Sequence, residues 1–266
     1  MTLDRLRTAL EEEDVDVRHL KTLREVATQN DDDLASLPET EVERQFPVYT
    51  LETTPEVALS LWEQLRELTD KTGYYPVILG DRDEVAHIWE HGEFPKLPHE
   101  YLEEAQAHDA QRWLDEEWKY NWSEKTGNKI LSREWDEKAG PWLSLKPKED
   151  IFWFLDPHVQ YIGLLATTES WQCPAYLPFG DFNDCRRASF HVCIHRYWQS
   201  KYKSEIIVMT HDTIICRVDA PVTTREAALP LAIEQTAYCS DSVGVITLGQ
   251  LASGLLNSRY WCFWWD

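Results

Sequence analysis

The chain ends in Tyr260-Trp261-Cys262-Phe263-Trp264-Trp265-Asp266, and this stretch decides how the second half of the protein folds. Most of these residues carry large aromatic rings, each of which buries about 150–250 Å² when it packs in a core. Because so much apolar surface is unfavourable in water, we expect the terminus to enter the core as a β-strand. The C-terminal half would then be one compact unit with its last carboxylates beside the folded body.

Upstream of this tail, residue patterns predict alternating strands and helices. We expect strands at 159–167, 205–210 and 213–218, helices at 190–202, 223–239 and 247–256, and a loop at 171–184. His211-Asp212 separates two β-rich runs at the spacing of a hairpin. This order predicts an α+β (mixed α/β) fold with a central mixed sheet flanked by helices.

The first half of the chain is more polar. We expect helices over 3–28, an exposed connection over 30–43 and a strand at 46–51. A helix follows, with Thr53 or Thr54 as its cap and Pro55 in its first turn, and it ends at Gly73 before a strand at 74–79. The pattern of residues 83–122 predicts a helical segment with an aromatic face, and residues 123–150 are predicted to form an irregular insertion. We therefore divide the chain into a helical N-terminal extension (1–45), an acidic α/β segment with a Trp-rich insertion (46–150) and a C-terminal module (151–266).

Charge and composition limit the class of partner. The formal net charge of the chain is −21, of which residues 1–150 carry −18. Such a field repels nucleic acids and anionic membranes but suits a basic protein. The sequence shows no apolar run of transmembrane length and no secretory signal, so we expect a cytoplasmic protein. Its six cysteines form no Cys-x-x-Cys pair, which favours reduced thiols.

Several strings in the second half are similar to those of one family. The stretch from Ala227 to Asp241, followed by the aromatic tail, resembles the domain-of-unknown-function 4253 family. Similar pieces are Phe179-Gly180-Asp181-Phe182-Asn183, His191 with Trp198 and Tyr202, Asp212, and Glu234-Gln235 with Tyr238-Cys239-Ser240-Asp241. The resemblance implies a C-terminal module that closes in Phe-Trp-Trp-Asp. The family label carries no activity, so the resemblance implies a fold unit and no function.

Two histidine pairs have the spacing of metal ligands on a helix. His87 and His91 belong to an inverted His-x-x-Glu-His motif, and His191 and His195 repeat the i,i+4 spacing. Gly92 and Pro95 end the first helix at once, and Trp198 and Tyr202 continue the stripe of the second, as on a half-buried helix face. We therefore expect no bound metal and no cofactor, and the four histidines remain candidates only.

A cluster of polar residues in the C-terminal module allows an enzyme. Five residues, together with His211, could meet at one end of the sheet and supply a nucleophile, a base and a group that orients the base; the five are His191, Asp212, Glu234, Cys239 and Asp241. The competing interpretation is a buried thiol beside turn and capping carboxylates.

The hypothesis we favour is a non-catalytic binding or regulatory protein that recognises a basic protein, as an immunity protein recognises a toxin. Aromatic residues surrounded by charge are the energetic centres of many interfaces. The candidates are four tryptophans in the acidic segment: Trp113, Trp118, Trp122 and Trp135. The oligomeric state does not follow from the sequence.

Overall fold

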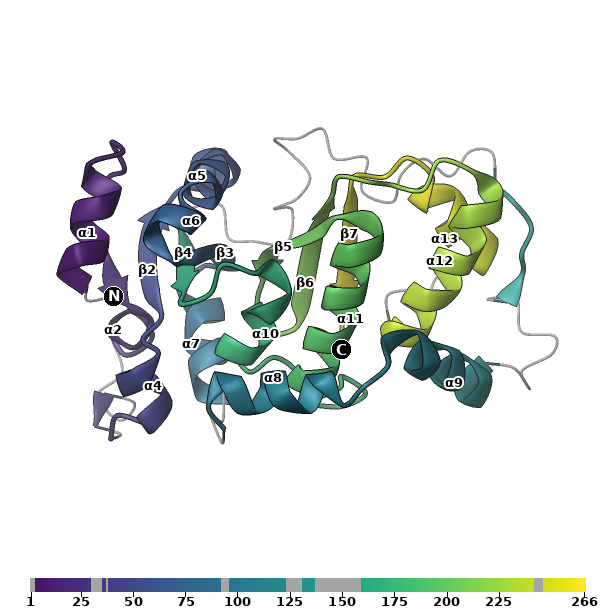
Figure 1. The fold of residues 1–266 in the computed structure, drawn as a ribbon, viewed down its shortest axis with the longest axis horizontal. Coiled ribbons are helices and arrows are strands. Elements are labelled where there is room, and N and C mark those ends of the chain that lie inside the picture. Colours follow the sequence, from purple (N-terminus) through teal and green to yellow (C-terminus); the bar gives the residue numbers. More distant parts are fainter. Residues whose placement is uncertain are drawn as a thin grey trace.

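A single mixed sheet with helices on both faces forms the body of the protein (Figure 1). The computed structural model describes residues 3–29, 35–36, 38–91, 96–122, 131–136, 159–241 and 246–266, and the statements below concern these residues. They form twelve α-helices and seven strands, which confirms the predicted α+β class. None of the described helices is long and apolar enough to cross a bilayer.

The strands are β1 (Lys21–Thr22), β2 (Tyr49–Thr53), β3 (Tyr75–Gly80), β4 (Gln160–Leu165), β5 (Ser204–Met209), β6 (Thr213–Val218) and β7 (Tyr260–Trp264). The helices are α1 (Leu3–Glu11), α2 (Leu23–Ala27), α4 (Glu41–Gln45), α5 (Pro55–Glu67), α6 (Thr69–Thr72), α7 (Arg82–His91), α8 (Pro98–Gln106), α9 (Ala110–Trp122), α10 (Cys173–Tyr176), α11 (Ala188–Tyr202), α12 (Arg225–Tyr238) and α13 (Leu248–Leu255).

The strands lie in the order β1-β2-β4-β3-β5-β6-β7, and every neighbouring pair is antiparallel except β3 and β5. Both β2 and β3 pair antiparallel to β4, so these two strands are parallel to each other and α5 connects them. The strand between them comes from a part of the chain beyond residue 150. The sheet is therefore continuous across the predicted segments 46–150 and 151–266, and the division itself stays a prediction.

Local signals in the sequence set several helix ends. Thr54 precedes α5 and Pro55 occupies its first turn, where a missing N–H costs nothing. Gly73 ends the helical stretch with a φ of 74°, in the left-handed region that favours glycine. The Thr224 hydroxyl accepts a hydrogen bond from the backbone N–H of Ala227 at the start of α12.

Three of the predicted segments differ in detail. Inside 3–28, Thr22 and Glu25 form a capping box, so the helix restarts there and the short strand β1 precedes it. The stretch 171–184 is not all loop, because Pro174 stands in the first turn of α10. Residues 83–122 form three helices, α7, α8 and α9. Of the predicted insertion 123–150, only 131–136 lie within the described residues.

Helices α11 and α5 cover opposite faces of the sheet. Cys216 and Trp261 are register partners on the face that meets α11, where the Cys216 sulfur lies 3.7 Å from His195 Nδ1. The next pair, Arg217 and Tyr260, faces the other way. On that side the Arg217 guanidinium lies over the ring of Trp62 from α5.

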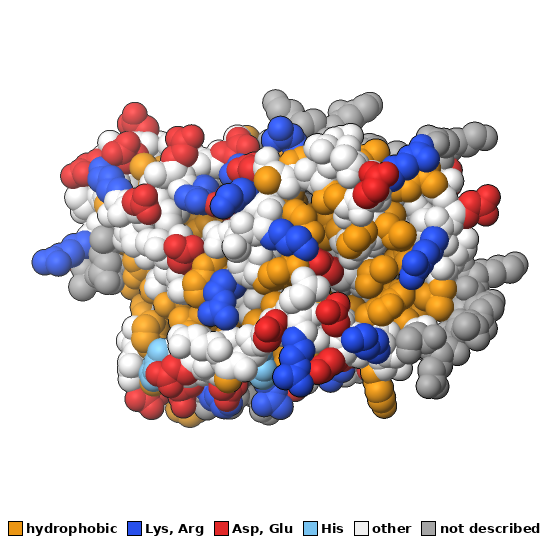
Figure 2. Space-filling model, turned by 45° about the vertical axis from the view of Figure 1, so that its right-hand side comes forward, with side chains coloured by type: hydrophobic (Ala, Val, Ile, Leu, Met, Phe, Trp, Pro, Cys, Tyr) orange, Lys and Arg blue, Asp and Glu red, His pale blue; other side chains and the backbone are white. Residues whose placement is uncertain are grey.

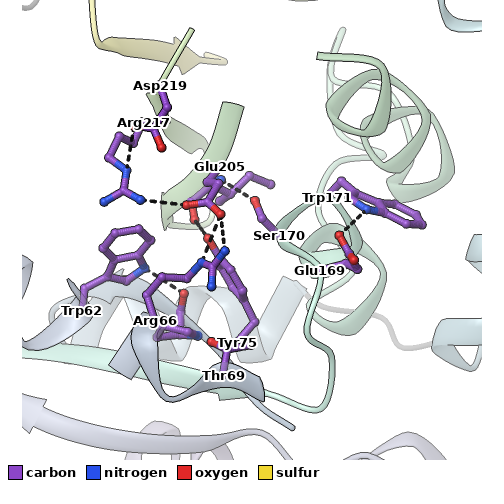
Figure 3. Close-up of polar contacts among 12 residues, drawn as sticks. Trp62, Arg66, Thr69, Tyr75, Glu169, Ser170, Trp171, Glu205, Arg217 and Asp219 are labelled. Carbon is purple, nitrogen blue, oxygen red and sulfur yellow. Dashed lines mark hydrogen bonds and ion pairs between the residues drawn. The ribbon is translucent and has the colours of Figure 1, made fainter. Parts of the chain in front are cut away.

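A charged cluster fixes α5 to the C-terminal strands (Figure 3). Glu205 accepts hydrogen bonds from Arg66 of α5 at 2.5 Å and from Arg217 of β6 at 2.9 Å. The Glu205 side chain is only 11% exposed, so its charge depends on both guanidinium groups. This cluster, which we call the Glu205 clamp, links the two halves of the chain through β5.

Candidate functional site

The terminal strand enters the core as predicted, but its rings divide between two environments. Trp261, Phe263 and Trp265 are at most 2% exposed, and the Trp198 ring of α11 lies 5.5 and 5.2 Å from the rings of the first two. Side chains alternate across a strand, so Trp264 points the other way and is 44% exposed. One indole of the tail is therefore partly exposed at the surface.

A chain of hydrogen bonds runs through the aromatic core between α11 and α12. His191 Nε2 lies 2.7 Å from the Arg186 carbonyl oxygen, which can only accept, so Nε2 carries the proton. In the neutral ring Nδ1 then accepts, and the Tyr238 hydroxyl donates to it at 2.5 Å. The same hydroxyl oxygen accepts from His195 Nε2 at 3.0 Å. In their neutral forms, both imidazoles therefore have defined tautomers in this chain.

Burial keeps the two histidines uncharged. Desolvation lowers the pKa of His191 to about 3, partly offset by its bond to the Arg186 carbonyl. Desolvation, together with the neighbouring His191, lowers the pKa of His195 to about 3 as well. Neutral imidazoles whose nitrogens already have partners stabilise the core and are poorly placed to exchange protons with a substrate.

The loop before α11 closes over this chain at Gly180. Its φ is 96°, and a Cβ placed there would lie 1.8 Å from the Arg186 carbonyl oxygen and 2.8 Å from His191 Nε2. Only glycine fits this close approach. The outer side of the same loop lines a cavity.

The cavity has a volume of about 770 Å³ and opens at the end of the sheet where β7 ends and α11 begins. Its walls come from α7, the start of α8, the loop 178–188, the β5–β6 turn and the tail. Aromatic and charged side chains share the lining, which includes Glu90, Lys96, Tyr101, Phe179, Asp181, Phe182, Arg187, His211, Asp212, Trp264 and Asp266.

Asp212 holds the exposed indole in this wall. Its Oδ2 accepts the Trp264 indole N–H at 2.8 Å, and its backbone oxygen accepts the Trp265 N–H at 3.1 Å. The hydroxyls of Thr210 and Thr213 donate to Oδ1 at 3.1 and 2.8 Å. The predicted hairpin turn is thus present, and Asp212 joins it to the tail.

The last residue is fixed in the same way. The backbone N–H of Asp266 donates to Asp241 Oδ2 at 3.3 Å, and its carbonyl oxygen accepts from Asn183 Nδ2 at 2.7 Å. The Asp266 side chain is exposed, as is that of Asp181 across the cavity lining. Two exposed carboxylates therefore line the same cavity as the Trp264 indole.

His211 occupies the turn beside Asp212 and is oriented by a helix from the first half. Its Nδ1 lies 2.6 Å from Glu84 Oε2 of α7, and its Nε2 lies 3.7 Å from Asp212 Oδ2. The hydrogen bond to Glu84 raises the pKa of His211, an effect that exceeds the opposing desolvation. The imidazolium form is therefore stabilised between two carboxylates.

The structure does not bring the five candidate catalytic residues into one cleft. Asp212 lines the cavity, whereas His191 is buried in the hydrogen-bond chain. Cys239 is fully buried and its thiol donates to the Trp264 carbonyl oxygen at 3.1 Å, while Asp241 binds the backbone of the tail. Glu234 is held elsewhere on α12 by Trp198 and Lys201. The buried thiol lacks the access that a nucleophile needs.

The four tryptophans proposed for binding pack against the body of the protein. Trp113 lies 5.4 Å from the Phe190 ring, and Trp118 stacks on Trp122 with 6.2 Å between centroids. Trp135 lies under the Arg225 guanidinium at 4.6 Å. Trp122 is buried and the other three are partly buried, so they present less free surface than the proposal assumed.

Among the described side chains, neither His87 nor the pair His191 and His195 belongs to a group that could hold a metal ion. His191 and His195 share the Tyr238 hydroxyl, and the His87 ring lies edge-on to His211 at 4.9 Å. The side chain of His91 lies outside the described residues. Among the side chains that are described, no group of three or more histidine, cysteine or carboxylate residues could hold a metal ion.

Sequence reasoning named Asp212 and His211 of the cavity lining but missed other residues that shape the cavity. Trp264 and Asp266 were grouped with the buried tail, although the period-2 alternation of a strand could have placed them opposite Phe263 and Trp265. Glu84 carried no signal, because its contact with His211 spans 127 positions.

Comparisons with known proteins agree with the resemblance seen in the sequence. Searches against curated proteins and against solved structures gave no significant match. The family model that matches covers residues 161–266, which include β4, the hydrogen-bond chain, the hairpin turn and the tail. These residues match the family model described as Domain of unknown function (DUF4253), as the aromatic tail suggested.

Proposed function

We propose that this protein is a non-catalytic, cytoplasmic binding protein that recognises a basic protein partner, in the manner of an immunity protein and its toxin. The observation that carries the proposal is the cavity, which combines the exposed indole of Trp264 with the carboxylates of Asp181, Asp212 and Asp266. An aromatic face beside carboxylates is a favourable environment for a cationic side chain.

The balance of charge in the lining supports a cationic ligand. Four carboxylate side chains line the cavity, from Glu90 and the three aspartates named above, against the cations of Lys96 and Arg187 and the imidazolium form of His211. Lys96 forms an ion pair with Glu104, which reduces its repulsion of a cation. The ligand would therefore meet a net negative wall.

The charge of the whole chain supports association with a basic partner. A net charge of −21 accelerates encounter with a positively charged protein at low salt. Figure 2 shows acidic and basic side chains interspersed over one face, with no single acidic field there. Long-range attraction would thus bring the partner close, and the cavity would supply the specific contact.

One observation supports the alternative hypothesis that the protein is an acid–base enzyme. Glu84 orients His211 as a carboxylate orients the base of a catalytic triad. The nucleophile proposed for such an enzyme, Cys239, is buried and bonded to the tail. Binding therefore fits the geometry better than catalysis.

Site-specific crosslinking tests the proposal. A benzophenone amino acid replaces Phe182, an aromatic residue that lines the cavity, and in a control it replaces Val57, which is exposed on α5. We expect illumination in cells to crosslink a basic protein at position 182 and not at 57, with a yield that falls as salt is added to extracts. Equal crosslinking at both positions, or a salt-independent acidic partner, would count against the proposal.

A further inference from the structure

We propose that the cavity holds an arginine side chain of the partner, with its guanidinium group stacked on the Trp264 indole and neutralised by the carboxylates of the lining. This inference rests on the proposed function and adds the chemical identity of the ligand. The way the protein pairs its own cations with aromatic rings supports this identity.

Within the described residues, the cations that lie over tryptophan rings are arginines, whereas tyrosine rings receive lysines and, at Tyr75, the guanidinium of Arg66. The cations over Trp62, Trp89, Trp135 and Trp171 are all arginines, at 4.6 to 5.7 Å from the ring centroids. The lysines that lie over rings, Lys96 and Lys201, lie over tyrosines. A planar, weakly hydrated guanidinium stacks on an indole better than a compact, strongly hydrated ammonium group does.

The Glu205 clamp shows how such a site is built (Figure 3). The Arg217 guanidinium lies 5.0 Å from the centroid of Trp62 and bonds Glu205 at 2.9 Å. Glu63 and Asp219 lie farther out, at 4.0 and 3.6 Å. One indole, one fixed carboxylate and two peripheral carboxylates therefore surround the guanidinium group.

A second site in the protein repeats the essential pair. Arg24 lies 5.3 Å from the Trp89 centroid and bonds Glu43 at 3.2 Å. The combination of indole and carboxylate is thus used for arginine in more than one place.

The cavity offers the same set of groups to a ligand from outside. Trp264 supplies an indole that is 44% exposed, and Asp212 supplies the carboxylate fixed beside it. Asp181 and Asp266 supply exposed carboxylates in the same lining. Three hydrogen bonds already occupy the Asp212 carboxylate, so the peripheral aspartates are the ones free to meet the N–H groups of the guanidinium.

The experiment compares two cationic peptides of equal charge with a neutral analogue. Fluorescein-labelled nona-arginine, nona-lysine and nona-citrulline are titrated with the full chain by fluorescence polarisation at one pH and salt concentration. We expect nona-arginine to bind about tenfold more tightly than nona-lysine. Citrulline keeps the planar shape without the charge, so we expect nona-citrulline not to bind. Trp264→Leu should bring the arginine-to-lysine ratio close to one.

The matched control is Tyr120→Leu, which removes an 87% exposed ring from α9, outside the cavity lining, and should leave the ratio unchanged. If Trp264→Leu fails to fold, the indole N–H resonance of Trp264 in the native chain is followed instead. N-acetylarginine amide should shift it, and N-acetyllysine amide should shift it less.

The outcomes separate the two proposals. Equal binding of nona-arginine and nona-lysine would overturn the arginine inference and leave the proposed function standing. An arginine preference that survives Trp264→Leu would also overturn it, because the preference would then arise elsewhere. Absence of binding to both cationic peptides would remove the proposed function itself.

Discussion

Alanine substitution of two neighbouring residues in the tail tests how the strand divides its rings. Phe263 is 1% exposed and Trp264 is 44% exposed, although both rings belong to β7. Phe263→Ala removes a ring from a closed core and leaves a cavity, which costs about 3–5 kcal/mol. For a chain of this size the melting temperature would fall by roughly 6–20 °C.

Trp264→Ala has a different cost. The space left by the removed indole opens to solvent, so this variant has no energetic penalty for an empty buried cavity. The covered half of the indole, on the order of 100 Å² at about 25 cal/mol per Å², contributes about 2.5 kcal/mol. Tyr120→Ala, which removes a ring that is 87% exposed, should cost less than about 0.5 kcal/mol.

Urea denaturation followed by circular dichroism measures the three free energies of unfolding. The expected order of destabilisation is Phe263→Ala, then Trp264→Ala, then Tyr120→Ala. A loss below about 1 kcal/mol for Phe263→Ala would refute the packing of the tail, since a fully buried ring cannot be removed so cheaply. Equal losses of unfolding free energy for Phe263→Ala and Trp264→Ala would refute the alternation of buried and exposed side chains along β7.

Three further predictions concern the clamp, the buried histidines and the loop over them. Glu205→Gln leaves two partly buried guanidinium groups facing each other, and we expect a loss of about 2–4 kcal/mol in urea denaturation, less than for a fully buried pair because both arginines are partly exposed. His191 and His195 have pKa values of about 3 in the folded protein, well below the usual value of 6.5, so the unfolded chain binds more protons between those values. Stability should therefore fall as the pH drops from 6.5 toward 3, by about 1.4 kcal/mol per pH unit for each histidine; unfolding free energies measured from pH 7 to pH 4.5 check this. Gly180→Ala should cost more than about 2 kcal/mol in the same urea assay, because its Cβ would overlap a carbonyl oxygen and its φ is positive.

Each of these has a matched control or a contrary outcome. Glu63→Gln removes a carboxylate 4.0 Å from Arg217 that is 56% exposed, and should change stability by less than about 0.5 kcal/mol. Gly73 has a φ of 74°, but a Cβ added there would meet open space. Gly73→Ala should therefore lower the free energy of unfolding by about 1 kcal/mol. A stability that stayed constant between pH 6.5 and pH 4.5 would contradict the neutral, buried state of the two histidines.

Much of the second half could be read from local pattern. The density of rings in 260–265 required burial, and a strand with period-2 alternation was the element that could supply it. The hairpin around His211-Asp212 followed from the two-residue spacing between two β-rich runs, although His-Asp is not a favoured turn pair. The start of α12 at Thr224 followed from capping chemistry, which depends on neighbouring residues. These features need only contacts between residues close in the chain.

The tertiary structure alone decided the sheet order and the cavity. The sequence determined that a strand would form near residue 160, but not that β4 would lie between β2 and β3. It determined that Trp264 would be in a strand, but the Asp212 carboxylate that holds its indole comes from a turn 52 positions away. Such contacts depend on how several elements pack together, and each element's own residues specify only which of its faces is apolar. The sequence of the tail therefore predicted that the tail is buried. Only the folded protein brings its partly exposed indole, Trp264, together with the carboxylates of the cavity lining.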